Sequence, residues 1–254
     1  MPATPPNPKS KPLRLAHTSD VHVGCGLRDP EGLWPELPLH MLDRVVATAL
    51  AEQADVLLIT GDLFDHNRVA APLAAAVMDM LVQSGLSVAI LPGNHDPYSK
   101  DSVYRRTEIP DNVHVFTSAT GELRVLPEVG AQLWGQAHVD YGDIAPFSHA
   151  PQWQADAEQP LWRIALGHGL YVRSDYERRF SFLIHDEDLE RLDAHYVGLG
   201  HLEGHEPIGP AGANAYYAGA PDRTGCTTVV ELGAHGTSVT LRSLAEHTRA
   251  PVAP

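Results

Sequence analysis

Apolar runs of strand length alternate with helical patterns along the first third of the chain. Residues 13–18, 55–60 and 87–91 form the apolar runs, and apolar residues recur at helical spacing over 37–53 and 69–84. Strands that alternate with helices in this way are typical of parallel βαβ units. The pattern therefore predicts an α/β fold.

Strand signals become more closely spaced after Pro110. A short helix fits 186–192, and a loop rich in Pro, Gln and Ala covers roughly 143–160. Further strands are predicted at 113–116, 122–126, 131–135, 163–167, 196–199, 215–218, 227–232 and 238–244. Because no repeat or linker divides the chain of 254 residues, we expect a single domain over 13–246.

The two ends of the chain differ from its middle. Residues 1–12 hold five of the 21 prolines and predict a disordered lead-in, and 247–254 predicts a tail. The first residues lack the apolar core of a secretory signal, and no run approaches the roughly 18 apolar residues that span a bilayer. We therefore expect a cytoplasmic protein without membrane contact.

The charge of the chain restricts its partners. It has 18 Lys and Arg against 32 Asp and Glu, a net charge of −14. Such a chain repels polyphosphate unless it concentrates positive charge locally or binds metal. This argues against a general nucleic-acid binder but not against one with a metal-filled cleft. Two cysteines are too few for a disulfide framework or a cysteine-based zinc site.

Aspartate, histidine and asparagine residues directly follow the apolar runs. Five segments show this: Asp20-Val21-His22, Gly61-Asp62-Leu63-Phe64-Asp65, Gly93-Asn94-His95-Asp96, Gly167-His168 and Gly200-His201-Leu202-Glu203. Loops after the carboxyl ends of such strands gather at one edge of a sheet, so we expect the five segments to meet. Carboxylate, imidazole and amide groups without thiolate suit Mn²⁺, Fe or Zn²⁺, and a carboxylate can bridge two ions about 3.5–4 Å apart.

In this order, the five segments resemble the signature of the calcineurin-like metallophosphoesterases. A narrower resemblance to SbcD-like DNA repair nucleases is carried by 15–24, 61–65, 91–97 and 217–224. Together the resemblance covers about residues 13–244 and implies a four-layer α/β/β/α sandwich with a binuclear metal site. SbcD-like nucleases carry a further DNA-capping domain after the catalytic core. We expect this chain to lack that domain, which disfavours processive work on duplex DNA.

The resemblance also implies a set of metal ligands. It implies two divalent ions, with Mn²⁺ expected first and Fe or Zn²⁺ as alternatives. The first ion would be held by Asp20 and His22, the second by Asn94, His168 and His201, and both by a bridging Asp62. A hydroxide between the ions would attack phosphorus in line with the leaving oxygen.

Three further residues receive roles from the same resemblance. His95 would lie beside the phosphate as a general acid or charge stabiliser. Either Asp65 or Asp96 would orient the histidines by hydrogen bonding.

The last segment departs from the family pattern. The family normally places a second histidine ligand of the first ion where this chain has Glu203. Three interpretations remain open. Glu203 could bind the ion through oxygen, His205 could reach in instead, or Glu203 could be a surface residue beside a weak first site.

Other polar residues near the motifs carry weaker hypotheses. His66 and Arg223 could contact substrate, although a solvated loop and a structural ion pair are the simpler interpretations. His17, within the first apolar run, is expected to pack in the core. Histidines without motif context, His138 among them, are taken as incidental.

Together these observations favour a phosphodiesterase acting on nucleotides or nucleic acid without duplex specificity. A small-molecule phosphomonoesterase is the first alternative, because the chain is short and acidic. A degenerate binding module is the second, because of Glu203. The oligomeric state is left open by the sequence.

Overall fold

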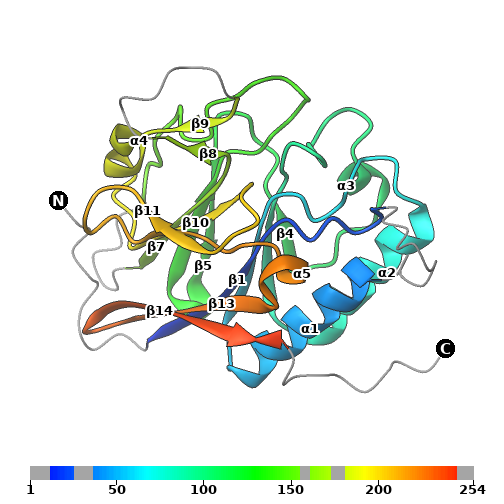
Figure 1. The fold of residues 1–254 in the computed structure, drawn as a ribbon, viewed down its shortest axis with the longest axis horizontal. Coiled ribbons are helices and arrows are strands. Elements are labelled where there is room, and N and C mark those ends of the chain that lie inside the picture. The colour runs from blue at the N-terminus through cyan, green and yellow to red at the C-terminus, as the bar shows by residue number, and fades with distance from the viewer. Residues whose placement is uncertain (1–11, 26–36, 155–160, 173–180, 245–254) are drawn as a thin grey trace.

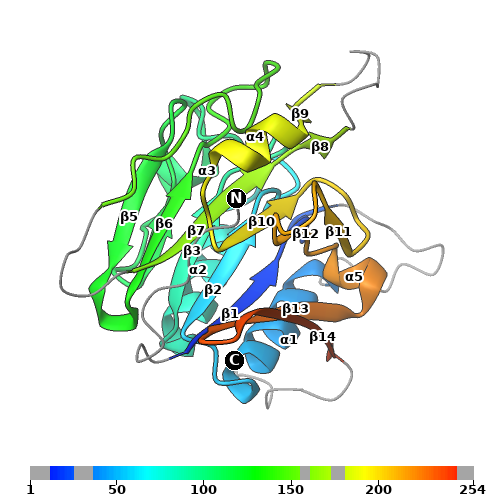
Figure 2. The ribbon, with the colours of Figure 1, turned by 90° about the vertical axis from the view of Figure 1, so that its left-hand side faces the viewer.

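The computed structural model describes residues 12–25, 37–154, 161–172 and 181–244. Two six-stranded sheets lie face to face at its centre (Figures 1 and 2). The first sheet has the strand order β14 (Gly236–Ser243), β13 (Cys226–Gly233), β1 (Leu13–Thr18), β2 (Val56–Thr60), β3 (Ser87–Leu91) and β4 (Val113–Val115). Strands β1 to β4 run parallel, whereas β13 and β14 pair antiparallel. The expected βαβ units are therefore confirmed.

The second sheet is also parallel in its centre. Its strand order is β11 (Glu206–Ile208), β12 (Ala215–Tyr217), β10 (Tyr196–Gly200), β7 (Trp162–His168), β6 (Ala131–Gly135) and β5 (Glu122–Leu126). The two edge strands, β5 and β11, pair antiparallel with their neighbours. A small pair, β8 (Leu170–Tyr171) and β9 (Leu183–Ile184), lies beyond β7.

Both faces of the central strands are buried, which explains their continuous apolar runs. On β2, Leu57 and Ile59 pack with the residues of the helices. Their neighbours Val56 and Leu58 instead pack with residues of the second sheet. Because successive side chains point to opposite faces of a strand, one apolar run supplies two separate cores.

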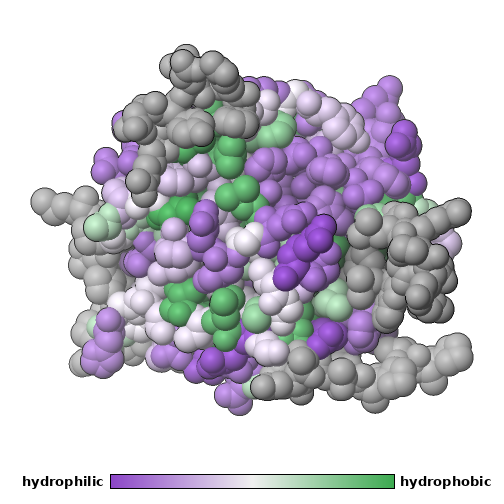
Figure 3. Space-filling model, in the orientation of Figure 1, coloured by the Kyte–Doolittle hydropathy of each residue, from purple (hydrophilic) through white to green (hydrophobic). Residues whose placement is uncertain are grey.

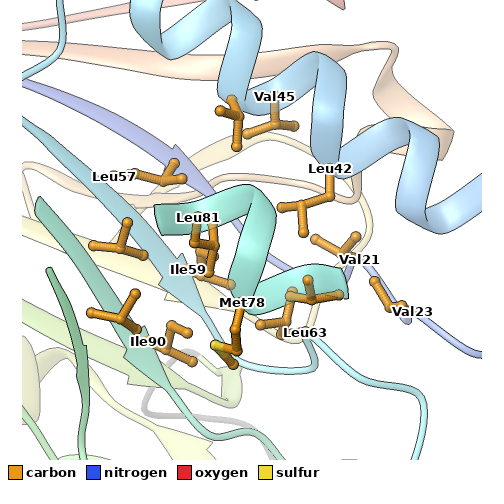
Figure 4. Packing of buried hydrophobic residues seen from close by; sticks show 14 of the residues in the cluster. Val21, Val23, Leu42, Val45, Leu57, Ile59, Leu63, Met78, Leu81 and Ile90 are labelled. Carbon is orange, nitrogen blue, oxygen red and sulfur yellow. The ribbon is translucent and has the colours of Figure 1, made fainter. Parts of the chain in front are cut away.

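Helices cover the outer face of each sheet. Long helices α1 (Leu37–Ala51) and α2 (Ala71–Ser84) lie on the first sheet, and the short α4 (Asp186–Arg191) lies on the second. Figure 4 shows the first of these cores, with side chains from α1, α2, β2 and β3: Leu42, Val45, Met78, Leu81, Leu57, Ile59 and Ile90. The order of layers is α/β/β/α, and the expected four-layer sandwich is confirmed.

Helix boundaries follow local chemistry. The helix expected over 69–84 begins at Ala71, and Pro72 lies in its first turn, where a missing N–H is tolerated. It ends at Ser84 because Gly85 adopts the left-handed conformation, with φ of 67°.

Several short elements had no signal in the sequence. These are α3 (Val103–Arg106), a 3₁₀ turn (Pro127–Val129), β8, β9, β11 and α5 (Pro221–Thr224). The expected lead-in, apart from Pro12, and the expected tail lie outside the described residues. No helix in the described part of the chain is long and apolar enough to span a bilayer.

Candidate metal centre

The carboxyl ends of strands from both sheets bring the five motif segments together. The Asp20 N–H donates to the Gly61 carbonyl at 3.1 Å, which joins the turns after β1 and β2. The His201 N–H, after β10, donates to the Asp20 carboxylate at 3.0 Å. Hydrophilic side chains gather on this face of the molecule, over the loops between α5 and α3 (Figure 3).

Asp62 lies at the centre of the group. One of its carboxylate oxygens is 3.2 Å from His168 Nε2 and 3.9 Å from His22 Nε2. Its other oxygen accepts a hydrogen bond from the His95 N–H at 2.9 Å. Asp20, His22 and Asp62 each present a ligand atom within 4.8 Å of the others. Two histidine Nε2 atoms thus lie within 4 Å of the same Asp62 oxygen.

Asn94 joins the two histidines of the second sheet. Its Oδ1 lies 3.0 Å from His168 Nε2 and 3.1 Å from His201 Nδ1. On the far side of the ring, His168 Nδ1 donates to the Thr60 carbonyl at 2.9 Å. That bond places a proton on Nδ1 and directs Nε2 to the centre of the site, the orientation that a metal ligand needs.

A second group lies further out. His22, Asp65 and His95 also present ligand atoms within 4.8 Å of one another. The Asp65 carboxylate is 3.3 Å from His22 Nδ1 and 4.0 Å from His95 Nδ1. The His95 Nδ1–H donates to the Asp65 carbonyl at 3.1 Å, so its Nε2 is available outward. With 46 % of its side chain exposed, His95 is the most accessible of the three.

The backbone of the site is strained. Asp20, His22 and Asp62 all have φ of 53°, and His201 has φ of 103°. Residues other than glycine rarely have a positive φ, and they keep it only where the surrounding structure enforces it. Four of the expected ligands therefore have locally unfavourable backbone conformations.

The glycines of the motifs make room for the ligands. A Cβ on Gly61 would lie 1.9 Å from His168 Nδ1, and one on Gly93 would lie 2.2 Å from the Asp62 carboxylate. A Cβ on Gly200 would lie 1.9 Å from the Thr60 carbonyl oxygen, the acceptor that orients His168. In these three motifs glycine precedes the ligand because a larger residue would collide with the site.

Burial and like charge perturb the carboxylates. Burial, together with the nearby charge of Asp62, raises the pKa of Asp20. Burial alone would also raise the pKa of Asp62, but His168 beside it holds that pKa well below its usual range. Despite its own burial, His168 has a pKa raised to about 9 by Asp62.

This donor set fits divalent ions. Asp62 and Asp20 are only 2 % and 3 % exposed, and their carboxylates lie within 4.8 Å of each other. His22 Nδ1 meets no hydrogen-bond geometry among the described residues, although the Asp65 carboxylate lies 3.3 Å away. Buried carboxylates of like charge are unfavourable in a protein unless a cation compensates them. Oxygen and nitrogen donors without thiolate match Mn²⁺, Fe or Zn²⁺.

Asp96 has a different place from the one expected. It accepts hydrogen bonds from the Gly93 and Phe64 N–H groups at 2.8 and 3.0 Å, and from the Tyr104 hydroxyl at 2.6 Å. It therefore shapes the turn after β3, while Asp65 is the carboxylate that lies beside the histidine rings. Burial raises the pKa of Asp96 to about 6.

Glu203 and Arg223 pair with each other at the surface. Glu203 Oε2 lies 3.3 Å from Arg223 Nε, and their side chains are 61 % and 59 % exposed. His205 contacts Thr228 Oγ1 at 3.1 Å through Nδ1. Neither Glu203 nor His205 belongs to the metal-type groups found among the described residues. His66 accepts a hydrogen bond from the Arg68 N–H at 3.2 Å and lies half-buried.

Three residues around the site carried no signal in the sequence. Tyr104 supports Asp96, and Asn67 Oδ1 accepts from the Val103 N–H at 2.9 Å, linking the loop after β2 to α3. His138, taken as incidental, is fully buried and its Nε2–H donates to the His168 carbonyl at 2.9 Å. These residues belong to segments without a motif, so spacing could not identify them.

Comparison with known proteins decides the family. The sequence profile of the calcineurin-like phosphoesterases matches residues 13–209. The chain belongs to this family. The chain is 27 % identical over 239 residues to the uncharacterized metallophosphoesterase YhaO of Bacillus subtilis. The aligned region covers 88 % of this chain and 56 % of the relative. The chain is also 27 % identical over 252 residues to a subunit of the nuclease SbcCD of Escherichia coli K12, with 82 % of this chain and 60 % of the relative covered.

The phosphoesterase thus spans less than two thirds of the length of these curated relatives. Its fold is similar to that of TT1561 of Thermus thermophilus, with a TM-score of 0.56 and 16 % identity over 91 % of this chain and 99 % of that one. The family is that of the calcineurin-like phosphoesterases, and the relatives of this chain include a metallophosphoesterase and a subunit of a nuclease.

Proposed function

We propose that this phosphoesterase hydrolyses phosphodiesters, of nucleotides or of nucleic acid without duplex specificity, at a binuclear metal centre. The observation that carries the proposal is the position of Asp62 between His22 and His168, with its carboxylate oxygen 3.9 and 3.2 Å from their Nε2 atoms. A carboxylate with nitrogen donors on both sides is the natural bridge of a two-metal site.

The ligand assignment follows the two sides of Asp62. Asp20 and His22 hold the first ion, and Asn94, His168 and His201 hold the second. Bound divalent ions polarise the phosphoryl oxygens and lower the pKa of bound water. Mn²⁺ is the ion we propose, because the ligand atoms are oxygens or imidazole nitrogens and none is a thiolate.

His95 supplies the proton for the leaving oxygen. Its Nδ1–H is committed to the Asp65 carbonyl, so its accessible Nε2 carries the proton that is transferred. Its backbone N–H meanwhile holds the Asp62 carboxylate in place. The Asp65 carboxylate lies 4.0 Å from the same Nδ1.

In this proposal Glu203 is not a ligand. The first ion is held by fewer protein groups than the second, because Glu203 is paired with Arg223 at the surface. We therefore expect the first site to bind metal more weakly and to lose it first on dialysis.

The test uses protein stripped of metal and reloaded with Mn²⁺. Hydrolysis of bis(p-nitrophenyl) phosphate is compared with that of p-nitrophenyl phosphate, in wild type and in His95→Gln. The proposal expects diester cleavage that depends on Mn²⁺ and falls about 10²- to 10⁴-fold in His95→Gln, the usual contribution of general acid catalysis. His235→Gln, an exposed histidine in the turn between β13 and β14, is the matched control and should retain full rate.

Three results would contradict the proposal. Preference for the monoester would make the protein a phosphomonoesterase. Unchanged turnover in His95→Gln would remove the assigned acid. Absence of turnover with both esters and every divalent ion would indicate a binding module instead.

A further inference from the structure

The loop over 138–143, which follows β6, runs along one rim of the site. The carbonyl of its first residue accepts a hydrogen bond from the Tyr98 N–H at 2.7 Å. At its other end, Asp143 accepts one from the Phe182 N–H at 2.7 Å. The Phe182 ring lies 5.8 Å from the His201 ring, measured between centroids. The loop is therefore tied to the turn after β3 and to the side of the site that contains His201.

Tyr141 lies in this loop and is 65 % exposed. Its hydroxyl is 3.3 Å from Nδ2 of Asn67, which is only 4 % exposed. The same Nδ2 donates to the Pro97 carbonyl at 2.9 Å, two residues after His95. The phenol is thus anchored to the same asparagine amide that holds the loop containing His95, while most of Tyr141 faces water. A ring held in this way loses little conformational freedom when it stacks on another ring.

A second aromatic ring, with a cation over it, is linked to the anchor of Tyr141 through Ser99. The Arg105 guanidinium lies 4.1 Å from the centroid of the Tyr98 ring, and its Nε donates to the Ser99 carbonyl at 3.1 Å. Asn67 Nδ2 lies 3.4 Å from Ser99 Oγ, which places this pair next to the Tyr141 anchor. Exposed aromatic rings beside cations bind ligands that combine planar rings with negative charge.

The acidic residues of the loop have other partners. Asp140 accepts a hydrogen bond from the Gly142 N–H at 2.7 Å, and Asp143 is engaged by Phe182 as described. The first bond directs the Asp140 carboxylate to the loop backbone, and the second directs the Asp143 carboxylate to the segment that contains Phe182. They also stiffen the loop on both sides of Tyr141.

We propose that Tyr141 is a specificity-determining residue: its ring stacks on a planar ring, such as a nucleobase, carried by one arm of the phosphoester. The inference rests on the proposed diesterase function, since it names the part of the substrate that the rim contacts. Tyr141 contributes to substrate binding and leaves the chemistry at phosphorus unchanged. Its substitution therefore acts on KM for substrates with rings and not on kcat.

The experiment compares two single strands of equal charge, a ten-residue oligothymidylate and a ten-residue abasic strand, both labelled with fluorescein. Cleavage by the Mn²⁺-loaded protein gives KM and kcat for each. Tyr141→Ala is expected to raise KM for oligothymidylate about tenfold, within the range for loss of one base–aromatic stack, and to leave the abasic strand within about twofold. Tyr141→Phe keeps the ring and should resemble wild type. Leu241→Ala, an exposed apolar residue on β14, is the matched control.

Fluorescence anisotropy in EDTA measures binding of the same strands without turnover. Equal losses for both strands in Tyr141→Ala, or no loss for either, would overturn the inference. A loss in Tyr141→Phe as large as in Tyr141→Ala would also overturn it, because the hydroxyl and not the ring would then matter. If wild type cleaves neither strand but binds them with the expected dependence on Tyr141, the diesterase proposal fails and this inference stands.

Discussion

The two ends of strand β1 show opposite ways of placing charge. At its first end, Arg14 donates to Glu231 at 2.7 Å and to the Glu52 carbonyl at 2.9 Å, with both charged side chains partly in water. Just beyond its last residue, Asp20 is 3 % exposed, has φ of 53° and faces the like charge of Asp62.

The comparison teaches where this fold tolerates instability. Charges at the first end have partners supplied by the chain. Because these pairs are partly exposed, they add little to the free energy of unfolding. At the other end, two buried carboxylates of like charge lie together with His168 as a histidine neighbour, and the strained backbone persists because the surrounding structure enforces it. Such an arrangement is useful only if a bound cation offsets it.

The largest effect that sharpens this contrast is expected for Asp20→Asn. The amide oxygen can still accept the His201 N–H, but the negative charge for metal is lost. We expect turnover to fall by more than about 100-fold, the upper range for residues that only support ligands. The free energy of unfolding of the metal-free protein should stay equal or rise, because burial and Asp62 disfavour the charged form of Asp20. Phosphodiesterase assays, metal analysis and urea unfolding in EDTA measure the three quantities. A marked loss of metal-free stability would show that Asp20 serves the fold.

The next effect is expected for Gly61→Ala. The new Cβ would lie 1.9 Å from His168 Nδ1, so the ring must move away from Asp62. Overpacking together with the left-handed backbone should cost about 2–4 kcal/mol and remove most of the metal affinity. Gly85→Ala is the control, since Gly85 also has positive φ but no atom lies within 4 Å of its Cβ position. It should lose only about 1 kcal/mol, from the left-handed backbone, and keep metal. Equal losses in the two variants would mean that backbone strain, and not contact with His168, determines the effect.

The sequence predicted the sheets and the meeting of the motifs for physical reasons. Strands β1 to β3 are buried on both faces, so their apolar runs were unmistakable. The turns after them had to share an edge because the strands are parallel.

Contacts made by segments without motifs could not be predicted from the sequence. Asn67 acts through a hydrogen bond to Pro97, far along the chain, and Tyr104 through one to Asp96 across a turn, and neither pairing follows from a regular spacing. The pairing of Glu203 with Arg223 depends on how the turn after β10 approaches α5, so three interpretations had stayed open. Strands of two or three residues, such as β8 and β11, are too short to show a period.

A smaller effect concerns His17, in the middle of β1. It is fully buried, and its ring nitrogens are hydrogen-bonded to Tyr196 and Thr60, both at 2.8 Å. Burial, with a contribution from His205, lowers the pKa of His17 to about 3. Because the unfolded chain protonates near its ordinary value of about 6.5, stability is present above that pH and is lost as pH falls toward 3.

We expect this one group to steepen the acid loss of stability by about 1.4 kcal/mol per pH unit between pH 6 and 4. Urea unfolding at several pH values in wild type and His17→Gln measures it as a difference in slope. The variant should be less stable at pH 7 but less sensitive to acid. Identical slopes would mean that His17 is not held neutral by the fold.

The smallest effect is expected at the first end of β1, for Glu231→Gln. The side chain of Glu231 is 46 % exposed and its partner Arg14 is 35 % exposed, so water and salt already screen the pair. Arg14 also retains its bond to the Glu52 carbonyl. Urea unfolding should show a loss below about 1 kcal/mol that shrinks further in high salt, and turnover should be unchanged. A loss of several kcal/mol would mean that the charge at this end also depends on a single partner. The contrast between the two ends of β1 would then fail.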